Sequence, residues 1–161
     1  MPDAAKIADL KATLRGQLID PKDPAYEEAR AVYNGMIDKR PLAIARCADV
    51  ADVIAAVNFG RDNGLPIAIR GGGHNGPGLG SVDKGLAIDL SPMKGVRVDP
   101  ETRTARVGAG CTQGDVDHAT HAFGLAVPAG IISTTGIAGL TLSGGHGYLS
   151  RKYGLTIDNL L

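Results

Sequence analysis

The sequence has only two cysteines, no net charge and no long apolar run. Seventeen basic residues balance seventeen acidic ones, so the whole chain exerts no field that would recruit nucleic acid or an anionic membrane. Neither eighteen consecutive apolar residues nor a signal-peptide pattern occurs, which argues against a transmembrane helix and against secretion. We therefore expect no nucleic-acid or membrane partner, and a reduced cytoplasmic protein in which Cys47 and Cys111 simply pack.

Several catalytic motifs are also absent. No GxxxxGK[ST] occurs, so a P-loop site for a nucleoside triphosphate is not expected. His118 and His121 have the spacing of a metal-binding pair on a helix, but no HExxH or carboxylate partner accompanies them. We therefore expect exposed histidines and no metal site.

Glycine, by contrast, is abundant, with 23 of 161 residues, about twice the usual share of roughly 7%. Seven glycines fall between Gly71 and Gly85, and six between Gly130 and Gly147. Both clusters lie between segments with apolar patterning and have no Gly-X-Y period, which argues against collagen and disorder. We interpret them as functional loops.

The local patterns predict a mixed α and β chain. We expect strands at 42–45, 66–70 (buried), 86–90 and 125–127, and a hairpin of 96–99 with 104–108. An N-terminal helix is predicted with Ile7, Leu10, Leu14 and Leu18 on one face, followed by a partly helical stretch around 26–32. A second helix should run from the N-cap Asp49 to Asn63-Gly64, with Val50, Val53, Ile54 and Val57 on one face. A third should begin at the capping box Thr112/Asp115, with Val116, Ala119 and Phe123 on one face, and a helical turn is expected at 148–153.

The first loop reads RGGGHNGPGLG over residues 70–80 and formally contains GxGxxG. In a dinucleotide-binding Rossmann unit the last glycine opens a helix. Here Pro77, Gly78 and Gly80 follow, and the next strand begins near Leu86, which leaves no room for that helix. The remaining interpretation is a concave run of backbone N–H groups that binds phosphate without net positive charge. The alternative is a tight surface loop.

The second loop runs from Pro128-Ala129-Gly130 through residues 133–139 (STTGIAG) to residues 143–148 (SGGHGY). Hydroxyls and backbone amides dominate it, which suits a diphosphate or the polar edge of a flavin ring. The alternative is a glycine-rich turn that packs a helix against a sheet.

Taken together and in order, these motifs, with RKYGLTIDN at 151–159, resemble those of the berberine-bridge-enzyme-like oxidases, which have the vanillyl-alcohol-oxidase-type (PCMH-type) FAD-binding fold. The resemblance implies an α+β domain with a small parallel β subdomain and a larger, mainly antiparallel β subdomain flanked by helices. It covers about residues 40–161, incomplete at the C-terminus and preceded by a helical extension over 1–39. The FAD-binding residues it implies are Arg70, Gly71, Gly72, Gly73, His74, Asn75, Gly78, Leu79, Pro128, Gly130, Thr134, Thr135, Gly136, Gly139, Gly144, Gly145, His146, Gly147 and Tyr148. Arg70 alternatively orders the loop, and Tyr148 is equally compatible with a core position.

The resemblance also implies that His74 bonds covalently to the 8α-methyl carbon of the flavin. Neutral imidazole is a competent nucleophile near neutral pH. Many relatives carry a second link through a cysteine, but that position is Ile132 here, so we expect attachment at His74 alone or tight non-covalent binding. The implied activity is oxidation of a small alcohol, sugar hydroxyl or amine with oxygen as acceptor. The catalytic base is not identifiable in this chain. Two alternatives are a non-catalytic flavin- or nucleotide-binding module and an NADPH-dependent reductase on the same fold.

Overall fold

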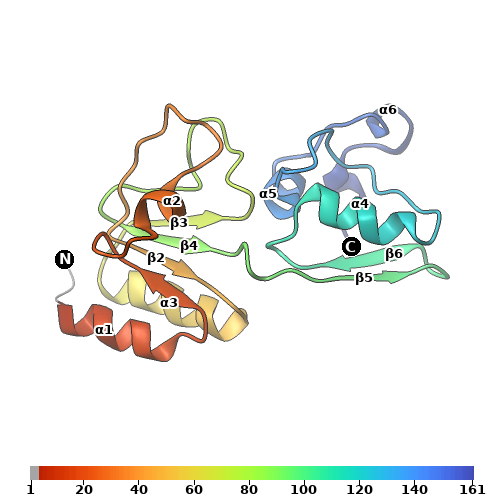
Figure 1. Ribbon diagram of the computed structural model, residues 1–161. Coiled ribbons are helices and arrows are strands. Elements are labelled where there is room, and N and C mark those ends of the chain that lie inside the picture. Colours follow the sequence, from red (N-terminus) through yellow and green to blue (C-terminus); the bar gives the residue numbers. More distant parts are fainter. Residues whose placement is uncertain (1–3) are drawn as a thin grey trace. The chain divides into compact units, whose positions relative to one another are not determined.

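The computed structural model describes residues 4–161. They divide into two compact units, a first that ends at Pro92 and a second that runs from Met93 to Leu161. Each unit has its own β-sheet (Figure 1) and its own cluster of buried apolar residues.

The first unit is built on a four-stranded sheet. Its strands are β1 (Gln17–Ile19), β2 (Ala43–Arg46), β3 (Ile67–Arg70) and β4 (Leu86–Asp89), in the order β1-β2-β4-β3. β2, β4 and β3 are parallel, and β1 pairs antiparallel with β2. The predicted small parallel sheet is confirmed.

Helices cover both faces of this sheet. α1 (Ala4–Thr13) and α3 (Val50–Asp62) lie on one side and α2 (Tyr26–Arg30) on the other (Figure 1). On the α2 side, Tyr26 packs with Ile19, Ile44 and Ala87 in a buried cluster. The β4 strand is buried along its whole length, as a central parallel strand must be when helices cover both faces.

The apolar pattern of α3 predicted the wrong buried face. Val50, Ile54 and Val57 are exposed, and the helix buries Asp52, Ala56 and Gly60 instead. The sheet-facing side is built from small residues, because a Cβ on Gly60 would collide with Ile67. Close approach of the helix, rather than large apolar side chains, decides which side faces the sheet.

Two further predictions in this unit are corrected. Leu18 does not continue the N-terminal helix but lies buried in β1, because the chain turns after Thr13 and pairs with β2. β3 is an edge strand in which Ile67 and Ile69 are exposed, so the prediction of a buried strand at 66–70 is only half right.

The second unit contains a two-stranded antiparallel sheet of β5 (Val96–Asp99) and β6 (Thr104–Val107), as predicted. α4 (Gln113–His121) begins at the predicted capping box of Thr112 and Asp115. α5 (Ile137–Leu142), α6 (Ser150–Tyr153) and the 3-10 helix η1 (Thr156–Asn159) follow (Figure 1). Cys111, Val116, Ala129 and Ile137 form the core.

In this unit the expected strand at 125–127 is absent, and these residues have no regular structure. Phe123 lies beyond the end of α4 and is 52% exposed, so it does not share the buried face, which Gln113, Val116 and Thr120 form. His118 and His121 are exposed, as expected. None of the helices within residues 4–161 combines the length and apolar character needed to cross a bilayer.

The predicted boundary between an extension (1–39) and the domain (40–161) stays a prediction. In the structure β1 pairs with β2, so residues 17–19 share one sheet with residues of the predicted domain.

Asp52, in the first turn of α3, connects the start of that helix to the segment after α1. Its carboxylate accepts backbone N–H bonds from Arg15 (2.8 Å), Gly16 (2.9 Å) and Ala48 (2.8 Å), and its side chain is buried. Burial acts to raise the pKa of Asp52, but the three N–H donors outweigh it and hold the pKa below its usual value. The turn after α1 is thereby attached to the start of α3.

We expect Asp52→Asn to lower the free energy of unfolding by about 2–4 kcal/mol at pH 7, because the amide NH₂ would face an N–H donor. A depressed folded-state pKa contributes stability above the unfolded pKa of about 3.9 and loses it as the pH falls through the folded pKa. The difference in the free energy of unfolding between the variant and wild type should therefore become smaller as the pH is lowered. Urea unfolding at several pH values measures the free energy of unfolding of both proteins, and Asp62→Asn, at an exposed position, is the control. Equal stability of the Asp52→Asn variant and wild type would contradict the role of Asp52 as an acceptor of three backbone N–H bonds.

Candidate functional site: two glycine loops

The first glycine loop leaves β3 at Arg70 and reaches β4 at Leu86 with no helix between them. This confirms that the dinucleotide-binding Rossmann interpretation fails. Gly73 has a φ of +70°, which only glycine adopts without strain. Within the described chain, the backbone N–H groups of Gly72 and Gly73 have no protein acceptor. The loop therefore offers amide donors of the kind that binds phosphate.

Arg70, at the end of β3, points away from the solvent and lies 8% exposed. Its guanidinium donates to Asp89 (2.9 Å) and to the carbonyl of Ala31 (3.2 Å). Asp89 is also buried, accepts the backbone N–H of Ser91 (3.0 Å), and lies 3.5 Å from Arg46. Of the two roles considered for Arg70, this geometry supports ordering of the loop; phosphate binding by Arg70 stays a prediction.

The remaining predicted residues of the first loop lie at or near its surface, apart from Gly78. His74 is half-buried and its ring is stacked on Tyr33, with centroids 4.1 Å apart. The side-chain oxygen of Asn75 accepts the N–H of Leu79 (2.9 Å), and Leu79 is exposed. Gly78, with a φ of +75°, is buried where a Cβ would collide with Ile37. Asn75 thus shapes the loop, and His74 lies half-buried within it beside Tyr33.

The second glycine loop is attached by its backbone to the start of α4. Gln113 N–H donates to Thr135, Gly114 N–H to Ser133, and Ile137 N–H to Cys111, each at 2.9 Å. α5, a helix that the sequence did not predict, then begins after Gly136. The loop is therefore a turn held by backbone hydrogen bonds, and it leads into a short helix. It also carries the hydroxyl side chains that we expected to bind a polar ligand.

The last part of this loop lies against η1 and Ala129. Gly144 and Gly145 have positive φ, and their carbonyls accept from Ile157 and Thr156. Gly147 is so close to the carbonyl of Ala129 that a Cβ would not fit. Two of the predicted residues, His146 and Tyr148, are exposed, so Tyr148 is not a core residue. Gly139 is also exposed, and Pro128, Gly130, Thr134 and Thr135 are exposed or half-buried.

Each loop has a buried polar side chain beside it that sequence reasoning missed. Among the described residues, the buried side-chain atoms without a hydrogen-bond partner are Ser81 Oγ and both amide atoms of Gln113. Ser81 follows the first loop directly. The Gln113 amide lies where a Cβ of Gly130 would contact it. Unsatisfied buried polar atoms are rare in folded proteins, so Ser81 and Gln113 stand out among the residues beside the two loops.

Alternative sites are not supported within residues 4–161. No group of three His, Cys, Asp or Glu side chains there could hold a metal. A cavity of about 300 Å³ lies between α1 and α3, lined by residues such as Leu10, Ala55 and Phe59, and neither glycine loop lines it. Cys47 and Cys111 are buried and unpaired, as expected. Burial raises the pKa of Cys47 to about 12, which leaves no reactive thiolate there.

Comparison with known proteins identifies the family. Residues 41–161 match the family model described as FAD binding domain. The chain belongs to this family. It is 38% identical over 149 residues to (R)-6-hydroxynicotine oxidase of Paenarthrobacter nicotinovorans, covering 92% of this chain and 32% of the relative. It is also 38% identical over 130 residues to berberine bridge enzyme-like 3 of Arabidopsis thaliana, covering 77% and 24%.

Solved structures of FAD-linked oxidases share the fold. The crystal structure of 6-hydroxy-D-nicotine oxidase from Arthrobacter nicotinovorans superposes with a TM-score of 0.88 at 38% identity, covering 90% of this chain and 32% of that one. A chitooligosaccharide oxidase superposes with a TM-score of 0.85 at 30% identity, covering 95% and 33%. The resemblance to berberine-bridge-enzyme-like oxidases and the PCMH-type α+β fold are confirmed. This FAD-binding chain spans about a third or less of the length of these relatives.

We expect Asp89→Asn to lower the free energy of unfolding by about 3–5 kcal/mol, because it leaves the buried Arg70 cation without its partner. The double variant Arg70→Met/Asp89→Asn should lose less free energy of unfolding than the two single variants lose together, because it removes both charges. Urea unfolding of the double-mutant cycle measures this.

Arg46→Met is the matched control, because Arg46 is more exposed and lies 3.5 Å from the same carboxylate; we expect it to cost at most about 1 kcal/mol. If the free energies of unfolding lost in the two single variants add up to the loss in the double variant, Arg70 and Asp89 do not act as a pair.

Proposed function

We propose that this chain forms the FAD-binding part of an FAD-linked oxidase and that both glycine loops contact the cofactor. The observation that carries the proposal is the first loop, in which the N–H groups of Gly72 and Gly73 have no acceptor in the described chain and Gly73 has a positive φ that only glycine adopts without strain. The family match over residues 41–161 supports the same cofactor.

The residues present fit FAD chemically. The first loop offers amides for a diphosphate without requiring net positive charge, which agrees with the balanced charge of the chain. The second loop offers the hydroxyls of Thr134 and Thr135, and the buried amide of Gln113 has both donor and acceptor capacity. We assign FAD contacts to all the residues predicted from the sequence except Arg70, to which we assign the ordering of the first loop.

We further propose that His74 holds the flavin covalently. The imidazole is half-buried in the loop and uses one face to stack on Tyr33. A ring nitrogen of His74 would replace a C–H bond of the 8α-methyl group with a C–N bond. The methyl hydrogen and the imidazole N–H leave as protons, and molecular oxygen accepts the two electrons through the flavin. Ile132 and the buried Cys111 offer no second attachment.

When bound, FAD supplies hydride acceptance from the substrate and passes the electrons to oxygen. The chain itself binds and orients that cofactor, and the base that takes the substrate proton is not identifiable among its residues. In the whole protein we propose oxidation of a small alcohol, sugar hydroxyl or amine. The similar proteins include an (R)-6-hydroxynicotine oxidase and a chitooligosaccharide oxidase, which supports substrates of this size. A cytoplasmic location also stays a prediction.

Two other functions differ in what they predict. A non-catalytic flavin-binding module would bind FAD but never oxidise sugars or alcohols within any longer protein that contains it. A reductase on the same fold would be reduced by NADPH, and a covalent histidine link argues against it. Oxygen uptake with a panel of sugars, alcohols and amines separates an oxidase from both.

We expect the purified chain to carry yellow flavin absorbance that survives acid precipitation. The His74→Ala variant should lose all of the acid-resistant flavin while retaining some non-covalent binding, because the loop amides remain. Absorbance and in-gel fluorescence measure both fractions.

His118→Ala is the matched control, because His118 is an exposed histidine on α4, and it should keep the wild-type covalent fraction. Acid-resistant flavin in the His74→Ala variant would refute the assignment of His74, and a colourless wild-type chain that takes up no added FAD would refute the proposed function.

A further inference from the structure

The segment of residues 31–40, which we call the strap, crosses the first glycine loop. It lies between α2 and β2, ahead of the residues that match the family model. Tyr33 N–H donates to the carbonyl of Gly73 (3.1 Å), and the Asn34 amide donates to that of Gly76 (2.9 Å). Lys39 Nζ donates to the carbonyl of Gly78 (2.8 Å). The strap therefore uses the carbonyls of the loop and leaves the N–H groups of Gly72 and Gly73 unpaired.

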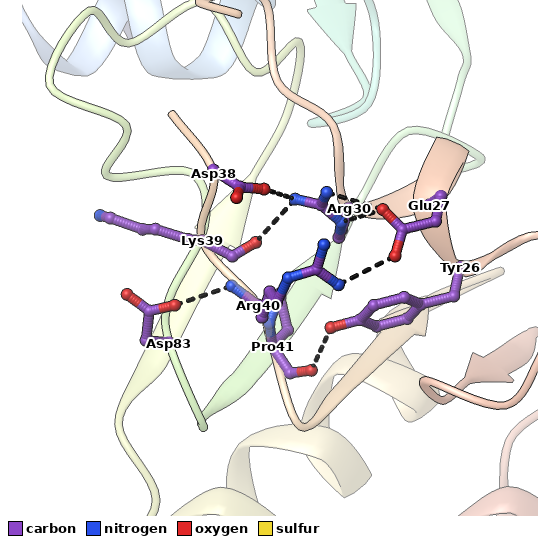
Figure 2. Close-up of polar contacts among 8 residues, drawn as sticks. All are labelled: Tyr26, Glu27, Arg30, Asp38, Lys39, Arg40, Pro41 and Asp83. Atoms are coloured by element: carbon purple, nitrogen blue, oxygen red, sulfur yellow. Dashed lines mark hydrogen bonds and ion pairs between the residues drawn. The ribbon is translucent and has the colours of Figure 1, made fainter. Parts of the chain in front are cut away.

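The strap is anchored at both ends by polar contacts, which Figure 2 shows. On the α2 side, Arg30 pairs with Glu27 and with Asp38, each at 2.6 Å. On the β2 side, Arg40 pairs with Glu27 (2.9 Å), and its N–H donates to Asp83 (2.8 Å). These contacts hold the two ends of the strap in place.

The hydroxyl of Tyr26, from α2, donates to the carbonyl of Pro41 (2.7 Å) inside the core (Figure 2). A buried neutral hydrogen bond of this kind is not screened by salt, unlike the exposed ion pairs around it. The position of the strap is thus set by the core of the first unit as well as by its surface charges.

On this anchored segment Tyr33 is stacked on His74. The two ring centroids lie 4.1 Å apart and the ring planes differ by 17°. Tyr33 is 71% exposed, so the side chain is not held there by burial in a core. The stacking covers one face of the imidazole. The lone pair of an imidazole nitrogen lies in the ring plane, so stacking on the face of the ring does not itself cover that lone pair.

We propose that Tyr33 is a positioning residue that fixes the plane of the His74 ring for attachment of the flavin. This inference rests on the proposed function, since it assigns a role to a neighbour of the proposed attachment residue. The strap brings Tyr33 to the loop through the backbone bond to Gly73, which directly precedes His74. Phenylalanine preserves the stacking surface, whereas leucine removes the aromatic ring at similar bulk.

The first test is the NMR spectrum of the flavin-free protein, which contains four histidines. The His74 ring protons, assigned by their loss in His74→Ala, should be shifted upfield by the ring current of Tyr33. Tyr33→Phe should keep the shift and Tyr33→Leu should abolish it. Tyr153→Leu, which removes an exposed tyrosine in the other unit, should leave it unchanged. An unaltered His74 shift in Tyr33→Leu would overturn the stacking.

The second test is the rate at which flavin-free protein forms acid-resistant flavin on addition of FAD in air. Misplacement of a reacting group by about 1 Å costs on the order of 10²-fold in rate. We expect Tyr33→Leu to slow attachment by about tenfold or more, and Tyr33→Phe to restore the wild-type rate. Equal rates in wild type and Tyr33→Leu overturn the positioning role while leaving the proposed function intact. Failure of the wild type to bind FAD overturns the proposed function, and the NMR test still decides whether Tyr33 orients His74.

Discussion

The buried ion pair between Arg70 and Asp89 is the constraint on which the first glycine loop depends. These residues are paired across β3 and β4 at the ends of two parallel strands, and both are buried. A buried charge without its partner is costly, so the end of β3 is held at one place beside β4. Because the loop begins at the next residue, the ion pair determines where the glycine-rich backbone leaves the sheet.

From that starting point the loop has no secondary structure of its own and takes its shape from its neighbours. The strap satisfies its carbonyls, Asn75 closes a turn within it, and Ile37 packs against Gly78. The N–H groups of Gly72 and Gly73 have no acceptor in the described part of the chain, which is why we assign them to the cofactor. A protein with no net charge binds an anion in this way, through oriented amide dipoles rather than a basic patch. The second loop follows the same rule, since its backbone bonds to residues 111–114 fix it and its hydroxyls remain at the surface.

Local signals in the sequence predicted the elements that local interactions determine. The capping box of Thr112 and Asp115, the N-cap Asp49 and the hairpin strands are all found where their short-range patterns placed them. The two glycine loops were predicted because clustered glycines disfavour a helix or a strand in the backbone where they occur. The α+β class was implied by the resemblance of the ordered motifs to one oxidase family.

What could not be predicted depends on residues far apart in the sequence. The apolar face of α3 is exposed because small residues let the opposite side approach the sheet. Phe123 falls outside α4, and α5 forms in spite of Gly139 because Gly136 and Ile137 lie beside the segment before α4. Asp89 and Tyr33 have no motif of their own. Their roles appear only when the sheet brings Asp89 to Arg70 and the strap brings Tyr33 to His74.

The most direct test of the account is to locate the flavin on the polypeptide. Trypsin cleaves after Arg70 and Lys84, and the resulting peptide of residues 71–84 contains the first glycine loop and a single histidine. Digestion of the acid-precipitated protein followed by mass spectrometry should find the flavin on this peptide, attached at His74. Flavin on a peptide containing His118, His121 or His146, or complete release of flavin by acid, would contradict the account.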